Sequence, residues 1–425
     1  MQAEHWGVLV IVAFFILLAL RVHVAVALAA PSIMYLLING EPLSIVGQNM
    51  VYSLFSYTIL SVPLFIFVGT FLNETGATTR IFDFTRYFMG EITGGLAYVN
   101  IYGSLIFSGI SGAALADIGG IGRMMLFAMD EDGYDRGYSA ALTSASAIVG
   151  PIFPPSIPLI VYALIAEQPV IPLFLAGIGP ALLLVALLTL ATMVLGRGGR
   201  FPTATKTSVS FKQLLYAIPA VITPVILVAG MLTGYFGPTG IAGAAIMYTL
   251  FLAVVVYRDM ETDYLFNAAR DTAATTSTIL FTVGAAVVFA YVMTITRIPT
   301  FVSEFMFSIT TNPALVLLTM LVTILLVGLV IEAMSAMLML TPIFLPIASD
   351  IGVGPIHFGV ILVYGLMFGL VTPPFGLALF MMSDVSNVEV EKIVKEMVPY
   401  YVPLLVGFIL IAYFPPISVW VLDFL

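Results

Sequence analysis

Cysteine is absent from this sequence of 425 residues, histidine occurs three times, and Asp, Glu, Lys and Arg together make up 9%. Without cysteine the chain has no disulfides, no thiol catalysis and no cysteine-ligated metal. His5, His23 and His357 are too few and too scattered to form a metal cluster. The sequence also shows no nucleophile–base pair, so we expect a protein that is not an enzyme and has no organic cofactor.

Basic residues are scarce as well: 14 Lys and Arg stand against 23 Asp and Glu, which gives a net charge of −9. With no basic patch to neutralise phosphates, nucleic acid is excluded as a partner. Hydrophobic residues make up 61% of the chain, and runs long enough to cross a hydrocarbon core of roughly 30 Å recur throughout. The runs do not alternate as barrel strands would. We therefore expect an all-α polytopic membrane protein within a lipid bilayer.

The N-terminus lacks the basic region of a cleaved signal peptide, so the first apolar run is expected to remain as a helix. A short loop between residues 196 and 213 carries four basic residues and no acidic one, which places it on the cytoplasmic side. Those residues are Arg197, Arg200, Lys206 and Lys212. The expected spans are 7–20, 22–38, 50–72, 171–195, 214–233, 239–257, 273–295, 313–331 and 398–422.

Two apolar regions, 104–166 and 323–384, are interrupted by Gly, Pro and hydroxyl residues, and they align without a gap. Gly150-Pro-Ile-Phe-Pro-Pro matches Gly369-Leu-Val-Thr-Pro-Pro, and the same register pairs Gly133 with Gly352 and Gly109 with Gly328. Interrupted helices at matching places in two halves are typical of the binding site of a secondary transporter. A helix broken inside the membrane exposes amides with partial positive charge and carbonyls with partial negative charge. The amides suit a carboxylate and the carbonyls suit Na⁺.

In the first region, small and hydroxyl residues between two apolar arms predict the tip of a re-entrant helical hairpin, although close helix packing is the alternative. Prolines further along force an unwound stretch with free carbonyls, or else a structural kink. The candidate binding residues of this half are Ser108, Gly109, Ser111, Gly112, Ser144, Ser146, Gly150, Pro154, Pro155 and Ser156.

The second region offers the counterpart, with a hairpin tip at 332–335 entering from the opposite membrane face. We expect the arms of both hairpins to be helices of about 10 residues, too short to span. The candidate binding residues of this half are Glu332, Ser335, Gly369, Thr372, Pro373, Pro374 and Gly376.

Two carboxylates stand among apolar residues, Asp117 in the first half and Glu332 in the second. An intramembrane carboxylate is costly and marks an ion or proton path by default. Either group could instead be an interfacial or paired structural charge, since Arg123 is within reach of Asp117 along the chain.

These motifs resemble the large membrane subunit of tripartite ATP-independent periplasmic (TRAP) transporters. The resemblance covers nearly the whole chain and is densest over 62–69, 94–97, 108–117, 133–135, 150–162, 340–346, 357–359 and 369–376. The sequence departs from the family where Glu332-Ala-Met-Ser335 replaces a small residue and an Asp, and where Gly365 replaces a frequent Asn.

The resemblance implies an inner-membrane subunit that pairs with a small four-helix membrane subunit and takes a small organic anion from a periplasmic substrate-binding protein. It implies coupling to Na⁺ and an elevator movement of a two-hairpin transport domain against a scaffold. Candidate Na⁺ ligands are Ser111 with Gly150 and Ser335 with Thr372. The implied domains are 1–95 and 171–312 (scaffold, the latter with a connecting arm), 96–170 and 313–385 (the two transport repeats), and 386–425 (C-terminal helix).

Two other functions fit less well. A stand-alone Na⁺/dicarboxylate symporter of the two-hairpin type would need no binding protein. An ion-translocating subunit of an energy-converting complex would need Lys and Glu midway along several spans, and this sequence has almost none.

Overall fold

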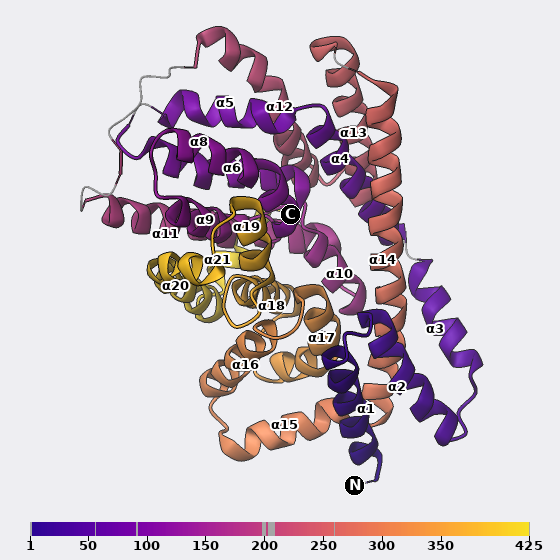
Figure 1. The fold of residues 1–425 in the computed structure, drawn as a ribbon. Helices are drawn as coiled ribbons and strands as arrows, with labels where there is room; N and C mark the ends of the chain where they lie inside the picture. Colours follow the sequence, from indigo (N-terminus) through magenta and orange to yellow (C-terminus); the bar gives the residue numbers. More distant parts are fainter. Residues whose placement is uncertain are drawn as a thin grey trace.

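The computed structural model describes residues 2–55, 57–90, 92–197, 201–202, 209–258 and 260–424, and every regular element in those ranges is a helix (Figure 1). Six of these helices are long and apolar enough to cross a membrane. They are Val170–Gly196 (α11), Phe211–Leu232 (α12), Pro238–Tyr257 (α13 with η3), Asp263–Ile295 (within α14), Ala333–Asp350 (α17) and Val390–Tyr413 (α20). Lys206 and Arg200 of the predicted cytoplasmic loop lie outside the described residues.

The N-terminal helices pack around the long helix α14 (Thr262–Ile295), which runs along one side of the molecule (Figure 1). These helices are α1 (Gln2–Ala19), α2 (Val24–Ile38), α3 (Ser44–Leu54), η1 (Tyr57–Leu60) and α4 (Ser61–Glu74). The predicted span at 50–72 is wrong, because α3 ends at Leu54 and α4 begins only at Ser61, with Pro63 in its first turn. Proline is tolerated there but clashes with a preceding helical turn.

Two amphipathic helices escaped the sequence analysis because neither is apolar all round. They are α5 (Ala77–Met89) and α15 (Ile298–Ile309). Each presents large apolar side chains to its surroundings, such as Phe88 on α5 and Phe305 on α15. Charged residues interrupt both runs, so a search for continuous apolar spans passes over them.

The internal repeat is confirmed by element boundaries that coincide in the two halves. The first repeat comprises α6 (Gly95–Ser111), α7 (Ala114–Asp117), η2 (Ile118–Gly122), α8 (Arg123–Glu131), α9 (Arg136–Ala147) and α10 (Ile157–Ile165). The second repeat comprises α16 (Pro313–Gly328), α17 (Ala333–Asp350), α18 (Pro355–Leu370) and α19 (Leu377–Ser386). The predicted register maps 114, 131 and 136 onto 333, 350 and 355, where helices begin, end and begin again. Gly133 and Gly352 both adopt left-handed backbone, with φ of 85° and 84°.

Both predicted hairpins are present, but their arms are longer than expected. The first tip is Gly112-Ala113, between α6 and α7, and the second tip is 329–332, between α16 and α17. The expected arms of about 10 residues are wrong, since α6 has 17 residues and α17 has 18. The glycines at 119–122 are absorbed in the π-helical turn η2, and Pro342 and Pro346 remain inside α17.

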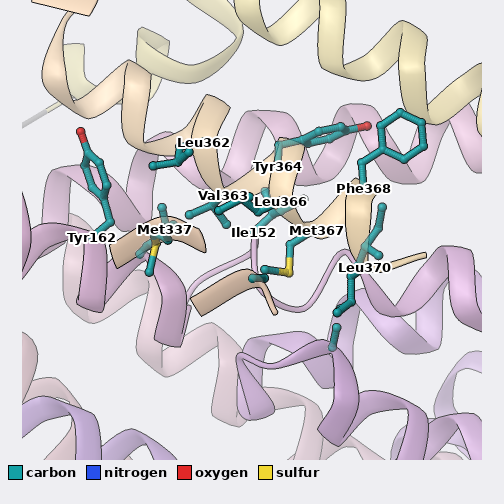
Figure 2. Packing of buried hydrophobic residues seen from close by; sticks show 14 of the residues in the cluster. Ile152, Tyr162, Met337, Leu362, Val363, Tyr364, Leu366, Met367, Phe368 and Leu370 are labelled. Atoms are coloured by element: carbon teal, nitrogen blue, oxygen red, sulfur yellow. The ribbon is translucent and has the colours of Figure 1, made fainter. Parts of the chain in front are cut away.

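The two repeats share one hydrophobic core. Ile152 of the first repeat and Met367 of the second lie in the same packed cluster (Figure 2), and both are buried. Tyr162 donates a hydrogen bond to the carbonyl of Pro355 across the repeats at 2.6 Å. Helix α11 packs on both repeats and on α20, through contacts with α6, α18 and α20.

An ion pair also joins α20 to the first repeat. Lys392 of α20 contacts Asp135, the N-cap of α9, with Nζ 2.8 Å from Oδ2. Partial burial raises the pKa of Asp135, but the hydrogen bond and charge of Lys392 and the backbone amide of Tyr138 outweigh it and lower the pKa overall. Both side chains are about half exposed, so this pair contributes little to stability.

The second hairpin depends on a close backbone approach that we expect a Gly369→Ala substitution to disrupt. A Cβ on Gly369 would lie 2.5 Å from the carbonyl carbon of Gly328, and such overpacking costs about 1–3 kcal/mol. Thermal unfolding of the purified chain in detergent should therefore begin several degrees lower. The control is Gly354→Ala, because no atom lies within 4 Å of a Cβ at Gly354. Equal melting temperatures for the two variants would contradict this packing.

Candidate functional site

The first broken helix is an unwound stretch between α9 and α10, where three prolines prevent helical hydrogen bonding. Its backbone is nevertheless satisfied from within the protein. The Ser156 hydroxyl donates to the carbonyl of Pro151 and accepts from the amide of Leu159 at 3.1 Å, and so it caps α10. The peptide bond between Pro154 and Pro155 is cis, as is the matching bond between Pro373 and Pro374.

The first hairpin tip sits directly on this break. Gly112 has φ of 62°, and its carbonyl accepts from the amide of Ile157 at 3.3 Å. A Cβ at Gly112 would lie 2.3 Å from the carbonyl oxygen of Pro155. Only glycine fits here, because the position needs both the left-handed backbone and the missing side chain. The tip and the broken helix are therefore one packed unit.

Asp117 is the chemical centre of this unit. The residue is 1% exposed, and its Oδ1 accepts a hydrogen bond from the Ser111 hydroxyl at the end of α6. Its Oδ2 is buried and has no hydrogen-bond partner. Gly150 lies on that side, because a Cβ there would be 2.5 Å from Oδ2. A buried carboxylate without compensating partners is costly. A small cation or a proton bound at Oδ2 would supply the missing partner.

The structural pairing of Asp117 with Arg123 that the sequence allowed is not formed. Arg123 points to the exposed side of α8, whereas the hydrogen bond that Asp117 makes within the described chain comes from Ser111. Of the two readings of Asp117, the isolated intramembrane carboxylate fits and the ion pair does not.

The second hairpin tip is built differently. Glu332 caps α17: its carboxylate accepts from the amides of Met334 and Ser335 at 2.9 and 3.0 Å and from the Ser335 hydroxyl at 2.8 Å. Glu332 was expected to lie deep in the protein, but it is exposed. It faces a cavity of about 320 Å³ that separates this tip from Gly376 of the second break. The other lining residues are apolar.

The second break is open where the first is sealed. Pro373 and Pro374 are exposed, whereas Pro154 and Pro155 are buried. The Thr372 hydroxyl donates to the carbonyl of Phe368, in the last turn of α18, at 2.7 Å, and the Ser335 hydroxyl donates to the carboxylate of Glu332. The structure thus gathers Ser111 and Gly150 around Asp117, while the hydrogen bonds of Ser335 and Thr372 go to separate partners.

Four other predicted residues have structural roles: two serines make hydrogen bonds within their own helices, and two glycines allow close contact between helices. Ser108 donates to the carbonyl of Leu105 at 2.7 Å, and Ser144 donates to that of Ala140 at 2.9 Å. Gly109 packs on Pro224 of α12, where a Cβ would be 2.5 Å from the proline ring. Gly369 packs on Gly328 in the second hairpin.

Ser146 belongs to a buried network that the sequence analysis missed. It donates to Asn100 Oδ1 at 2.8 Å, and the Ser104 hydroxyl donates to Ser146 Oγ at 3.1 Å. A signal was present in the sequence: Asn100, Ser104 and Ser111 fall on one face of an otherwise apolar helix.

Basic side chains are absent from the sequence of the second repeat, and the first repeat contains only Arg123 and Arg136. Arg136 lies 3.7 Å from Asp130 at the start of α9, with about 40% of both side chains exposed. No lysine or arginine lines the cavity at the second tip. Among the described residues, no group of three His, Asp or Glu side chains could hold a metal.

Paired hairpins and broken helices, with a buried carboxylate of which one oxygen has no partner, are typical of a secondary transporter. The profile of the family described as "Tripartite ATP-independent periplasmic transporter, DctM component" matches residues 11–417. The chain therefore belongs to this family, as the large membrane subunit of a TRAP transporter. It is a multi-pass inner-membrane transport protein and not an enzyme.

Three relatives show how far the similarity extends. The chain is 35% identical to the sialic acid TRAP transporter large permease protein SiaM of Vibrio cholerae, over 89% of this chain and 90% of that one. It is 32% identical to the C4-dicarboxylate TRAP transporter large permease protein DctM of Pseudomonas aeruginosa, over 85% of each. It is 35% identical to the sialic acid TRAP transporter permease protein SiaT of Haemophilus influenzae, over 88% of this chain but only 61% of SiaT.

The fold also resembles that of a solved transporter. The crystal structure of the YdaH transporter of Alcanivorax borkumensis, described as having an unusual topology, superposes with a TM-score of 0.68. The match covers 88% of this chain and 90% of that one, at 14% identity. At this identity the likeness shows the fold alone.

The contact between tip and break yields a matched pair of glycine substitutions. Gly112→Ala should abolish most transport, because its Cβ would drive the tip off the Pro155 carbonyl. Gly133→Ala meets a similar left-handed backbone, with φ of 85°, but nothing within 4 Å of its Cβ. Both variants carry about 1 kcal/mol of backbone strain, so a difference in uptake between them is due to the steric clash of the new Cβ with the Pro155 carbonyl. Uptake is measured in cells and normalised to membrane expression. Equal uptake by the two variants would contradict the contact.

Proposed function

We propose that this chain is the Na⁺-coupled subunit of an importer for small organic anions. The observation that carries the proposal is Asp117 Oδ2, a buried carboxylate oxygen without a partner. It lies between the Ser111 hydroxyl and Gly150, where the first hairpin tip meets the first break. A Na⁺ ion there would bring the positive charge that the protein does not supply.

The substrate class is supported by the names of the relatives. SiaM is named for sialic acid and DctM for C4-dicarboxylates, and both classes are organic acids.

Ser335 and Thr372 flank the second tip and break, and we propose them as ligands of a second ion next to the substrate. We also propose that the two repeats, which are joined by the hydrogen bond from Tyr162 to the carbonyl of Pro355, move together against the scaffold helices.

The partners follow from the length of one relative. The match covers only 61% of SiaT, so SiaT has a segment outside the matched region. We propose that this segment corresponds to a small membrane subunit that is a separate chain here. A periplasmic binding protein would deliver the substrate.

Uptake should therefore require three components. Proteoliposomes that contain this chain alone, with an inward Na⁺ gradient and labelled sialic acid or a C4-dicarboxylate, should accumulate nothing. Adding the small membrane subunit and the binding protein encoded beside it should restore uptake. Robust uptake by this chain alone would instead favour a stand-alone symporter.

Na⁺ coupling should depend on the proposed ligands. Ser111→Ala and Thr372→Ala should each raise the Na⁺ concentration for half-maximal uptake, because losing one oxygen ligand costs about 1–2 kcal/mol, or roughly 5- to 30-fold. Asp117→Asn, which removes the charge, should have the largest effect. Expression and assembly with the small subunit should be unchanged. Uptake that follows a pH gradient and ignores Na⁺ would overturn the assignment of the ion.

A further inference from the structure

Four buried polar side chains join the first hairpin to the first broken helix. Asn100 Nδ2 of α6 donates to Thr143 Oγ1 of α9 at 2.7 Å, and Asn100 Oδ1 accepts from Ser146 Oγ at 2.8 Å. Ser104 Oγ of α6 donates to Ser146 Oγ at 3.1 Å. All four residues are 2% exposed or less. The amide of Asn100 thus spans two hydroxyls, one helical turn apart on α9.

The same amide also reaches the second arm of the hairpin. Asn100 Nδ2 lies 3.6 Å from the sulfur of Met129 on α8. The methyl group of Thr143 packs on Gly122 in η2, where a Cβ would be 2.8 Å away. Gly122 in turn lies against the carbonyl of Asp117. Asn100 therefore contacts α8 and α9 directly and supports η2 through Thr143.

Along both α6 and α9, the network lies a few turns before the residues that contact Asp117. Ser111, which donates to Asp117, lies three turns beyond Asn100 on the same face of α6. Gly150, which lies against Asp117 Oδ2, follows Ser146 by four residues. The Asn100 contacts fix how far α6 can slide along α9. A slide would separate Ser111 from Gly150.

We propose that Asn100 is a positioning residue for the ion pocket: it locks α6 and α9 in the register that brings Ser111 and Gly150 to Asp117. The proposal rests on the proposed function, which assigns Na⁺ to this pocket. Asn100 does not touch the ion. It acts through the relative placement of two ligand-bearing segments, and small errors in such placement are enough to weaken a site.

The test measures Na⁺ binding without transport. Full-length chain in detergent is melted over a series of NaCl concentrations, with KCl keeping the ionic strength constant. The melting temperature in KCl shows whether a variant is structurally damaged. The Na⁺ concentration that gives half of the Na⁺-dependent rise in melting temperature measures the Na⁺ affinity of the pocket. Asn100→Leu keeps the side-chain volume and removes the hydrogen bonds, and Ser146→Ala is a milder second variant in case Asn100→Leu fails to fold.

The control is Ser139→Ala on the same helix. Ser139 is as buried as Ser146, but its hydroxyl donates only to the carbonyl of Asp135 in its own helix, at 3.1 Å. We expect Asn100→Leu to raise the half-saturating Na⁺ concentration at least fivefold and Ser146→Ala about threefold. Ser139→Ala should leave it unchanged. In the three-component uptake assay at saturating Na⁺, the KM for substrate should be the same for Asn100→Leu and Ser139→Ala.

The outcomes separate the two proposals. If wild-type chain gains stability from Na⁺ but Asn100→Leu and Ser146→Ala keep the wild-type half-saturation, Asn100 has only a structural role and this inference is overturned. If wild-type chain and Asp117→Asn respond identically to Na⁺ and K⁺, the Na⁺ pocket itself is wrong, and the role of Asn100 falls with it.

Discussion

A lipid bilayer offers no water to backbone groups that a helix leaves free, and the structure is organised around this constraint. The first hairpin tip and the two breaks leave carbonyls without helical partners, and the protein supplies partners for them. Ser156 donates to Pro151, the amide of Ile157 to Gly112, and Tyr401 to Val371 at 3.0 Å. The break carbonyls are thus satisfied from the break itself and from α20, and the first break in turn satisfies the carbonyl of the hairpin tip. The first hairpin tip and its break therefore stabilise each other.

The two repeats keep the same backbone plan but meet this constraint in different ways. The first tip closes directly on its break, and Asp117 is sealed between them. The second tip is held by the carboxylate of Glu332 and leaves a cavity of about 320 Å³ before its break. In the repeat register, Ala113 occupies the position of Glu332 and Ala336 that of Asp117. The symmetric backbone thus presents one enclosed acidic pocket and one open, mostly apolar cavity, which suits ligands of different size.

The architecture could be predicted from the sequence because it depends on residues with distinctive backbone behaviour: proline, which cannot continue a helix, and glycine, which alone adopts left-handed backbone readily. Paired glycines and prolines held one register over both halves, and Gly112, Gly133 and Gly352 end helices as expected. The arm lengths were missed because glycine does not always break a helix: the stretch 118–122 continues as a π-turn. The cap made by Glu332 and the network of Asn100 were missed because each depends on a neighbour's position in space. A carboxylate between apolar runs looks the same in sequence whether it is buried or capping.

The scarcity of basic residues in the two repeats affects how the charge of a bound ligand can be balanced. All 14 basic residues lie outside the second repeat, and the two in the first repeat are at its charged edge. On the proposed function, a small organic anion bound at the second tip would have no lysine or arginine beside it to pair with. Its charge would be balanced by helix N-termini, which carry only partial charge, and by cations that travel with it. Glu332 adds a negative charge beside the open cavity, so an anion there would need a cation more than it would in a neutral site. The proposed dependence on a co-transported ion would then arise from the scarcity of basic residues in the repeats.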